Sequence, residues 1–118
     1  MVTGGSRGIG AAIVQRLAAE GANVVFTYAS SPDQAKKIVE TAQASGVKAL
    51  AIQADSADAQ AVISAVERTV KELGGLDILV NNAGVLAMGP VDTFALADFD
   101  RTVAINIRAV FVATQAAV

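Results

Sequence analysis

Glycines near the start of the chain are spaced as a ligand-binding turn requires. They lie in the segment Thr3–Gly10, which reads T-G-G-S-R-G-I-G and follows the short apolar stretch Met1-Val2. Gly4 permits a sharp exit from a strand, Gly8 leaves the backbone bare beside a pyrophosphate, and Gly10 lets the following helix pack closely. That helix would point its unpaired N–H groups and positive dipole end at the phosphates. The pattern predicts a nucleotide-binding turn; an ordinary tight strand-to-helix turn is the alternative.

Residues 23–28 are expected to form the second strand. The residues at its end indicate which dinucleotide the turn would bind. They read Tyr28-Ala29-Ser30-Ser31, and no acidic residue appears before Asp33. Turns that select NAD usually carry an acid here, where it accepts hydrogen bonds from the ribose hydroxyls. Arg7 can instead donate paired hydrogen bonds to a 2′-phosphate, with the hydroxyls of Ser30 and Ser31 as further donors. The sequence therefore favours NADP(H), and the alternative for Arg7 is a solvated surface charge.

Strand and helix patterns alternate along the chain. Apolar or β-rich runs predict strands over 1–3, 23–28, 47–54 and 76–80, and helical periodicity predicts helices over 8–20, 32–45, 58–73 and 98–118. Ser31 is expected to cap the second helix, with Gln34 completing a capping box. Buried strands that alternate with helices form a parallel sheet covered on both faces. The predicted fold class is therefore α/β, a doubly wound Rossmann-type sheet of about four strands, in a single dinucleotide-binding domain over residues 1–118.

Both ends of the chain are unusual for a complete domain of this type. The central strand would consist only of Met1–Thr3, and the last helix reaches Val118 without a glycine or a polar cap. We therefore expect the domain to be incomplete and to be part of a larger one.

The composition disfavours several classes of function. Of the 118 residues 53% are hydrophobic and 17% charged, and the net charge is −2, which argues against disorder and against binding to nucleic acid or an anionic membrane. The chain has neither cysteine nor histidine. Disulfides, thiol nucleophiles and a Ser-His-Asp mechanism are therefore excluded for these residues, and no metal site is expected. With no secretory signal or membrane-spanning stretch in the sequence, the expected location is the cytoplasm.

Four features, in order along the chain, resemble the short-chain dehydrogenase/reductase family. They are the opening T-G-x-x-x-G-x-G, Asp55 after the third strand, Asn81-Asn82-Ala83-Gly84 after the fourth, and Asn106 within V-A-I-N-I. The match corresponds to the N-terminal half of a family member and is most similar to the NADP-dependent 3-oxoacyl-(acyl-carrier-protein) reductases. The resemblance implies hydride transfer from NADPH to a ketone or 3-oxoacyl thioester, with this chain supplying the cofactor-binding half. It also implies a small-molecule carbonyl substrate and a homo-oligomer, either a dimer or a tetramer.

The resemblance also implies roles for polar residues at the strand ends. The Asp55 carboxylate would accept a hydrogen bond from the adenine amino group beside the Ser56 backbone, and Asn82, Ala83 and Gly84 would contact the cofactor ribose. From the residues alone, Asp55 and Ser56 could instead cap the third helix, and the asparagines could form a turn that satisfies its own backbone. The expected cofactor-binding residues are Gly4, Ser6, Arg7, Gly8, Ile9, Gly10, Tyr28, Ser30, Ser31, Asp55, Ser56, Asn82, Ala83 and Gly84.

Asn106 is the one catalytic residue expected in the chain. A polar amide close to Val103, Ile105, Ile107 and Val110 is unusual for a helix packed on a sheet, and a buried asparagine needs hydrogen-bond partners. The resemblance implies that it holds a water in the relay that returns a proton to the catalytic lysine. An asparagine on the exposed side of the helix is the alternative.

The tyrosine and lysine that the family uses for catalysis are not among these residues. The sole tyrosine is Tyr28, on the adenosine side of the sheet, and the residue four places later is Pro32 rather than lysine. The chain by itself is therefore expected to bind cofactor at most. A non-catalytic dinucleotide-binding module or an inactive fragment is the alternative function. A methyltransferase-type Rossmann domain is disfavoured, since it would need an acid after the second strand.

Overall fold

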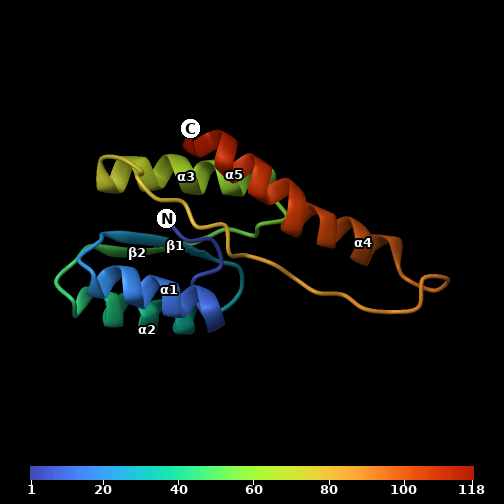
Figure 1. Ribbon diagram of the computed structural model, residues 1–118, viewed down its shortest axis with the longest axis horizontal. Helices are drawn as coiled ribbons and strands as arrows, with labels where there is room; N and C mark the ends of the chain where they lie inside the picture. Colours follow the sequence, from blue (N-terminus) through green and yellow to red (C-terminus); the bar gives the residue numbers. More distant parts are fainter.

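The computed structural model describes all 118 residues and shows a small parallel sheet between two layers of helices (Figure 1). The predicted α/β class is therefore confirmed. In chain order the elements are α1 (Gly8–Ala19), β1 (Val24–Tyr28), α2 (Pro32–Gln43), β2 (Ala49–Gln53), α3 (Ala59–Leu73), α4 (Leu96–Val103), the π-helical turn η1 (Ala104–Arg108) and α5 (Ala109–Ala117). No helix is both long enough and apolar enough to span a lipid bilayer.

The sheet has two regular strands rather than about four. β1 and β2 pair in parallel along their whole length, and beside β1 the chain continues the sheet only through parallel bridges from Val2 to Phe26 and to Val80. The expected strands over 1–3 and 76–80 are therefore reduced to single bridges. The reason is that the first segment has only three residues, so it offers few N–H and C=O groups to the neighbour on either side. The order across the sheet is β2, β1, the Val2 segment and the Val80 segment.

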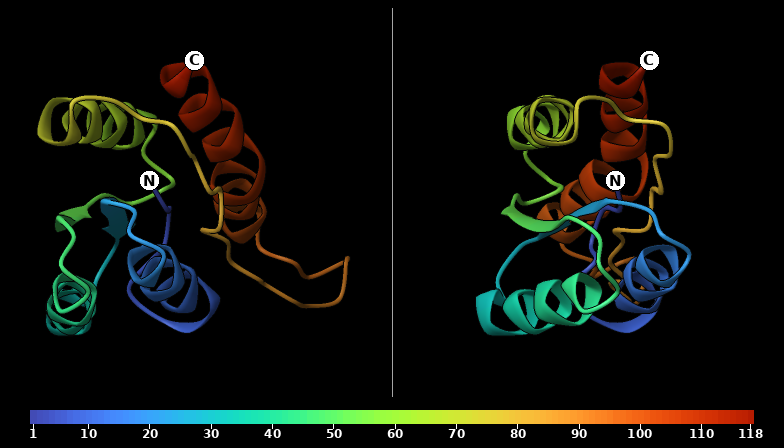
Figure 2. Two further views of the ribbon diagram at one scale, coloured as in Figure 1. Left: turned by 60° about the vertical axis from the view of Figure 1, so that its left-hand side comes forward. Right: turned by 90° about the vertical axis from the view of Figure 1, so that its left-hand side faces the viewer.

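Helices cover both faces of the sheet, as the apolar strand pattern predicts. Alternate residues of β1 point to opposite faces: Val24 and Phe26 join a core cluster under α1 and α2, whereas Val25 joins a second cluster under α3. All three side chains are at most 1% exposed. Figure 2 shows α1 and α2 on one side, and α3 and α5 on the other. The carboxyl ends of β1, β2 and the Val80 segment therefore meet at one edge.

The C-terminal helix is a single run of 96–117 that is interrupted by a π-helical turn, rather than the uniform α-helix expected from Asp98 onward. It begins two residues earlier than predicted, at Leu96. The turn η1 contains Asn106 and Arg108, and both side chains are hydrogen-bonded to loops at the edge of the sheet. π-helical turns insert an extra residue in a helix and are frequent at functional sites. The π-helical turn, which the periodicity of the sequence does not reveal, therefore coincides with hydrogen bonds from the helix to other segments of the fold.

The second and third helices begin differently from what their sequences suggest. Ser31 occupies the N-cap position of α2 but makes no capping hydrogen bond, so the predicted capping box with Gln34 is wrong. Its side chain lines a cavity instead of accepting a hydrogen bond from the N–H groups of the first turn. Asp58 caps α3 by accepting hydrogen bonds from the N–H groups of residues 60 and 61. The alternative that Asp55 and Ser56 cap this helix is therefore excluded.

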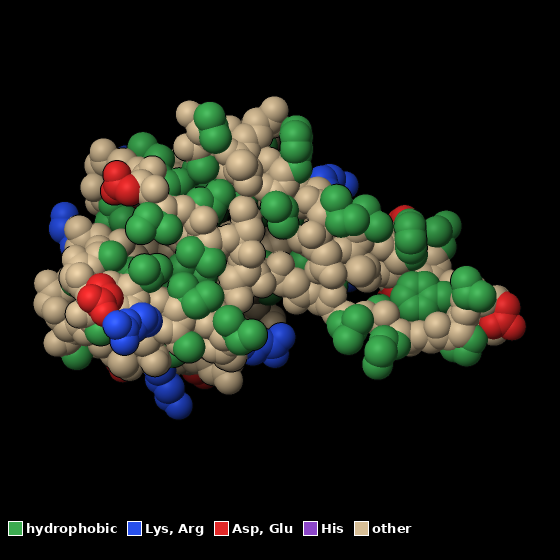
Figure 3. Space-filling view, in the orientation of Figure 1, with side chains coloured by type: hydrophobic (Ala, Val, Ile, Leu, Met, Phe, Trp, Pro, Cys, Tyr) green, Lys and Arg blue, Asp and Glu red, His purple; other side chains and the backbone are tan.

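Several large apolar side chains are left exposed towards the C-terminal end of the chain. Figure 3 shows hydrophobic side chains gathered on the projecting loop between the Val80 segment and α4. In this loop Leu86 is 81% and Met88 84% exposed, and on the last helix Ile107 is 65% and Phe111 63% exposed. Phe111, therefore, does not face the sheet.

Candidate cofactor-binding site

The glycine turn leaves the sheet in a conformation that other residues rarely adopt. Gly4 has a φ of +68° and Gly8 a φ of +55°, both in the left-handed region that favours glycine. The turn is tied to β1 through Thr27, whose Oγ1 accepts a hydrogen bond from the Gly4 N–H at 3.1 Å and whose carbonyl accepts one from the Gly5 N–H at 2.9 Å. The backbone path of the turn is therefore set by glycine and held by β1.

Two glycines of the turn have no room for a side chain. A Cβ on Gly5 would lie 2.5 Å from the Cβ of Phe26, and a Cβ on Gly10 would lie 2.1 Å from the carbonyl oxygen of Gly4. At Gly8, by contrast, a Cβ would meet nothing within 4 Å. Gly5 and Gly10 thus permit close packing inside the protein, whereas Gly8 leaves open space on the ligand side.

A run of backbone N–H groups at the start of α1 has no partner in the protein. The first hydrogen bond of the helix runs from the Ala11 N–H to the Arg7 carbonyl, and the Arg7 side chain does not cap the helix. The N–H groups of residues 6–10 are therefore free to bind a ligand. Together with the helix dipole, they form a site for an anion such as a pyrophosphate.

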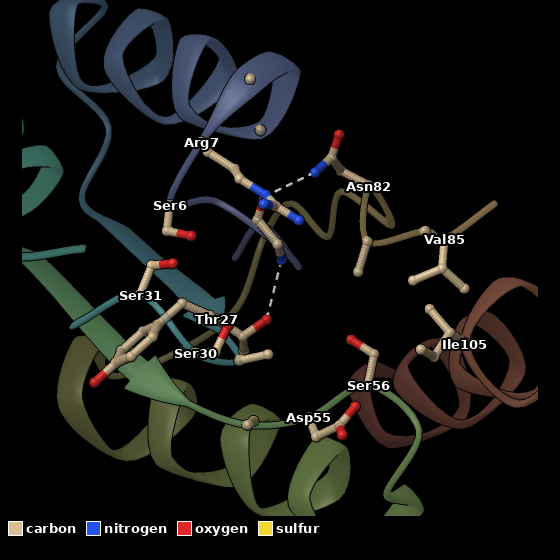
Figure 4. A pocket seen from close by; sticks show the side chains of 18 of the residues that line it. Ser6, Arg7, Thr27, Ser30, Ser31, Asp55, Ser56, Asn82, Val85 and Ile105 are labelled. Atoms are coloured by element: carbon tan, nitrogen blue, oxygen red, sulfur yellow. Dashed lines mark hydrogen bonds between the residues drawn. The ribbon is translucent and has the colours of Figure 1, made fainter. Parts of the chain in front are cut away.

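Asn82 acts as a brace for the glycine turn. Its Nδ2 donates hydrogen bonds to the carbonyls of Thr3 at 2.9 Å and Gly4 at 3.0 Å, and Figure 4 shows its amide pointing toward the turn. The Thr3 hydroxyl accepts hydrogen bonds from the N–H groups of Asn82 and Ala83, each at 3.0 Å. The two amide hydrogens of Asn82 are thus already used, so the alternative of a turn that satisfies only its own backbone is wrong.

The expected cofactor-binding residues all line one cavity of about 410 Å³ at this edge of the sheet. In Figure 4, Ser6, Arg7 and Ser31 lie along one side of it and Asp55 and Ser56 along the other. Such crevices at the carboxyl ends of parallel strands are where ligands bind in open α/β sheets. The lining residues that the sequence did not single out are Thr27, Ala29, Ala54, Val85, Arg101 and Ile105.

Asp55 lies at the end of β2 with both carboxylate oxygens engaged. Its Oδ1 accepts a hydrogen bond from the Ala57 N–H at 2.9 Å, and its Oδ2 lies 3.3 Å from Nη1 of Arg101. The Ala57 hydrogen bond is the main reason that the pKa of Asp55 lies below its ordinary value; burial opposes this shift and Arg101 adds to it. The carboxylate is therefore held in its ionised, hydrogen-bond-accepting form.

The lowered pKa of Asp55 predicts that this residue contributes to how the unfolding free energy depends on pH. Because the pKa is lower in the folded state, this contribution is present above the ordinary aspartate pKa of about 4 and is lost as the pH falls through the folded value. Asp55→Asn should therefore flatten the decline of the unfolding free energy below about pH 4, as measured by urea unfolding at a series of pH values. Asp92→Asn, which removes a carboxylate from an exposed loop, is the matched control.

Asn106 is exposed rather than buried, which corrects the expectation drawn from its apolar neighbours. The reason is that its apolar neighbours do not all lie on a buried face, since Ile107 is 65% and Val110 38% exposed. Its amide is nevertheless satisfied: Oδ1 accepts a hydrogen bond from the Val85 N–H at 2.9 Å, and Nδ2 donates to the Val85 carbonyl at 2.8 Å. The side chain thus fastens the loop after the N-N-A-G segment to the π-helical turn, and its predicted catalytic role stays a prediction.

Removing this double hydrogen bond should loosen the loop locally. Asn106→Ala should lower the free energy of unfolding by about 1 kcal/mol, because two hydrogen bonds are lost but the freed Val85 groups can reach water. Amide hydrogen exchange at Val85 should accelerate at the same time. Asn81→Ala is the control, since the Asn81 side chain donates its hydrogen bond to the Thr114 hydroxyl, at 3.2 Å, and not to Val85. Unchanged protection at Val85 would contradict this role.

Comparison with known proteins gives the same interpretation as the geometry. The model of the short chain dehydrogenase family matches residues 1–118. The chain belongs to this family. The resemblance inferred from the glycine turn, Asp55, the N-N-A-G segment and Asn106 is thereby confirmed.

Solved structures of family members share the fold closely. A short-chain dehydrogenase from Burkholderia cenocepacia in complex with NADP is 57% identical, with a TM-score of 0.97 over 98% of this chain and 47% of that one. A short-chain dehydrogenase/reductase from Serratia marcescens is 58% identical, with a TM-score of 0.96 over the same shares. The doubly wound Rossmann-type architecture predicted from the sequence is therefore confirmed.

Among curated proteins, the chain is similar to the 3-oxoacyl-[acyl-carrier-protein] reductase of Staphylococcus aureus. The two are 41% identical over 117 residues, which cover 99% of this chain and 48% of the reductase. The chain thus spans about half the length of the curated relatives it matches.

Arg101, which lines the cavity, and Arg108, which lies beside it, are two charged residues whose contacts with the site the sequence analysis missed. Both lie on the C-terminal helix and reach the Asp55–Ala57 turn. A signal was present, because positions 101, 105 and 108 follow the i, i+4, i+7 spacing that places side chains on one helix face. Two arginines on the helix face that also carries the apolar Ile105 could have indicated that they bond to polar groups at the edge of the sheet.

Proposed function

We propose that the full-length protein is an NADPH-dependent oxidoreductase and that this chain forms its NADP(H)-binding half. The observation that carries the proposal is the cavity at the sheet edge. One side offers the free N–H groups of residues 6–10 and the Arg7 guanidinium, and the end of β1 contributes Ser30 and Ser31 but no carboxylate. The N–H groups and the guanidinium favour the phosphates of NADP(H). The ribose of NAD(H), whose hydroxyls usually bond to an acidic side chain here, is disfavoured.

The residues present fit the parts of the cofactor in order along the cavity. The N–H groups at the start of α1 would hold the pyrophosphate. Arg7, Ser30 and Ser31 would bind the 2′-phosphate, Asp55 would accept a hydrogen bond from the adenine amino group, and the backbone near Gly84 would contact a ribose. This assignment is supported by the NADP complex of the Burkholderia cenocepacia relative.

When bound, NADPH supplies the hydride that reduces a carbonyl group. We propose a ketone or a 3-oxoacyl thioester as the substrate, an assignment supported by the likeness to the Staphylococcus aureus reductase. Asn82 and Thr3 would keep the glycine turn in shape around the pyrophosphate. Asn106 would keep the loop beyond Gly84 against the last helix, at the near end of the cavity.

Titration of the full-length protein with NADPH and with NADH tests the proposal. We expect NADPH to bind at least about tenfold more tightly, because NADH lacks the 2′-phosphate that Arg7 would bind. Oxidation of NADPH in the presence of a 3-oxoacyl thioester or a simple ketone, followed by its absorbance, tests the reaction class. Equal affinities would refute the cofactor assignment, and binding without turnover on either substrate would favour the non-catalytic module.

A further inference from the structure

We propose that Arg101 is a positioning residue that, together with Arg108, holds the Asp55–Ala57 turn in the form that presents the Asp55 carboxylate to the adenine ring. The inference rests on the proposed function in that its ligand is NADP(H). It assigns the C-terminal helix a part in cofactor affinity, although that helix follows the glycine turn by almost ninety residues.

Three polar contacts converge on these three residues of the turn. Arg101 Nη1 donates a hydrogen bond to Asp55 Oδ2 at 3.3 Å, across 46 residues of sequence. Arg108 Nη2 donates to the Ala57 carbonyl at 2.7 Å, across 51 residues. The Ala57 N–H donates to the remaining oxygen of Asp55 at 2.9 Å. The helix is therefore hydrogen-bonded to the first and the last residue of the turn, and an internal hydrogen bond joins these two residues.

The geometry of the helix makes this grip possible. Arg101, before the π-helical turn, and Arg108, at its end, both reach the same Asp55–Ala57 turn, and between them Ile105 is only 4% exposed and lines the cavity. Figure 4 shows Ile105 on the cavity wall beside Ser56, close to Asp55. The next residue along the helix, Asn106, is bonded to the Val85 backbone. The helix is thus anchored to both loops that border the cavity.

The carboxylate needs such a partner because it is not buried. The Asp55 side chain is 46% exposed, so without Arg101 its outer oxygen can be solvated in other rotamers, and cofactor binding must then order it. Arg101 is itself 51% exposed, which limits the effect to that of a partly solvated ion pair. We therefore expect the loss of Arg101 to weaken NADPH binding by about threefold to fivefold, not to abolish it.

Titration of the full-length protein with NADPH tests the proposal. Arg101→Met, which keeps much of the side-chain length but removes the charge, should weaken NADPH by about fivefold, and Arg101→Lys should restore part of the affinity. In an Asp55→Asn background Arg101→Met should change the affinity little further, because Arg101 acts through that carboxylate. Binding of reduced nicotinamide mononucleotide, which lacks adenine, should be the same in all these variants. Arg68→Met is the matched control, since Arg68 pairs with Glu72 at 3.7 Å on the surface of α3.

The outcomes separate this inference from the proposed function. If the wild-type protein binds NADPH and Arg101→Met binds it equally well, the inference is overturned and the proposed function stands. A loss of affinity for both ligands, or one that persists in the Asp55→Asn background, overturns it as well, because Arg101 would then act on the whole site. Absence of NADPH binding by the wild-type protein overturns both. If Arg101→Met does not fold, the comparison of Arg101→Lys with wild type decides.

Discussion

Arg7→Ala is expected to weaken NADPH binding by about 10- to 100-fold while changing NADH binding less than about twofold. The side chain is exposed and lines the cavity next to Ser30 and Ser31, and NADPH differs from NADH only by the 2′-phosphate. A charge-assisted hydrogen bond to phosphate is among the stronger interactions that one side chain can supply. Fluorescence titration of the full-length protein with each reduced cofactor measures both affinities.

The matched control for Arg7 lies on the same helix. Arg16→Ala also removes an exposed arginine from α1, but Arg16 pairs with Glu20 at the far end of the helix and does not line the cavity. It should leave both affinities unchanged. If Arg7→Ala weakened NADPH and NADH to the same extent, Arg7 would be acting on the shared pyrophosphate, and the preference for NADP(H) would lose its main support.

Gly10→Ala is expected to lower the free energy of unfolding by about 3 kcal/mol. The added Cβ would lie 2.1 Å from the Gly4 carbonyl oxygen and 2.5 Å from Asn82 Nδ2. The first of these atoms is backbone and the second is held by hydrogen bonds, so neither can move aside cheaply. The start of α1 must therefore move away from the Gly4 carbonyl and from the Asn82 side chain. Urea unfolding of the variant and the wild-type protein measures the loss.

Gly75→Ala is the control for this substitution, since its Cβ would meet nothing within 4 Å and its φ is not in the left-handed region. It should change stability by less than about 0.5 kcal/mol. Both variants add one methyl group, which meets the turn and Asn82 at position 10 and open space at position 75. A stability loss at Gly10 no larger than that at Gly75 would show that the turn can widen, and the close packing inferred for it would be wrong.

Much of the candidate site was predictable because its signals are local. The glycine turn requires particular φ values and an absence of side chains at particular positions, and both requirements are visible as residue types. The N-N-A-G segment and Asp55 follow apolar runs, and the carboxyl ends of parallel strands must meet at one edge. For this reason every residue expected to bind the cofactor was found lining a single cavity.

Other parts of the site could not be predicted, because they depend on partners far apart in the chain. The Asn82 amide is bonded to the Gly4 carbonyl across 78 residues, and Arg101 meets Asp55 across 46. Asn106 was expected to be buried from its apolar neighbours, yet it is exposed and bonded to Val85. Likewise, Ser31 has the residue type of a helix cap but lines the cavity instead.

By itself, then, the sequence determined the alternation of strands and helices and the shape of the glycine turn, because these follow from periodicity and backbone freedom within short segments. Its motifs carried the resemblance to the family. Only the tertiary structure decided how far the sheet extends, where the last helix becomes π-helical, and which side chains hold the loops around the cavity. Those features depend on hydrogen bonds between segments that the fold brings together.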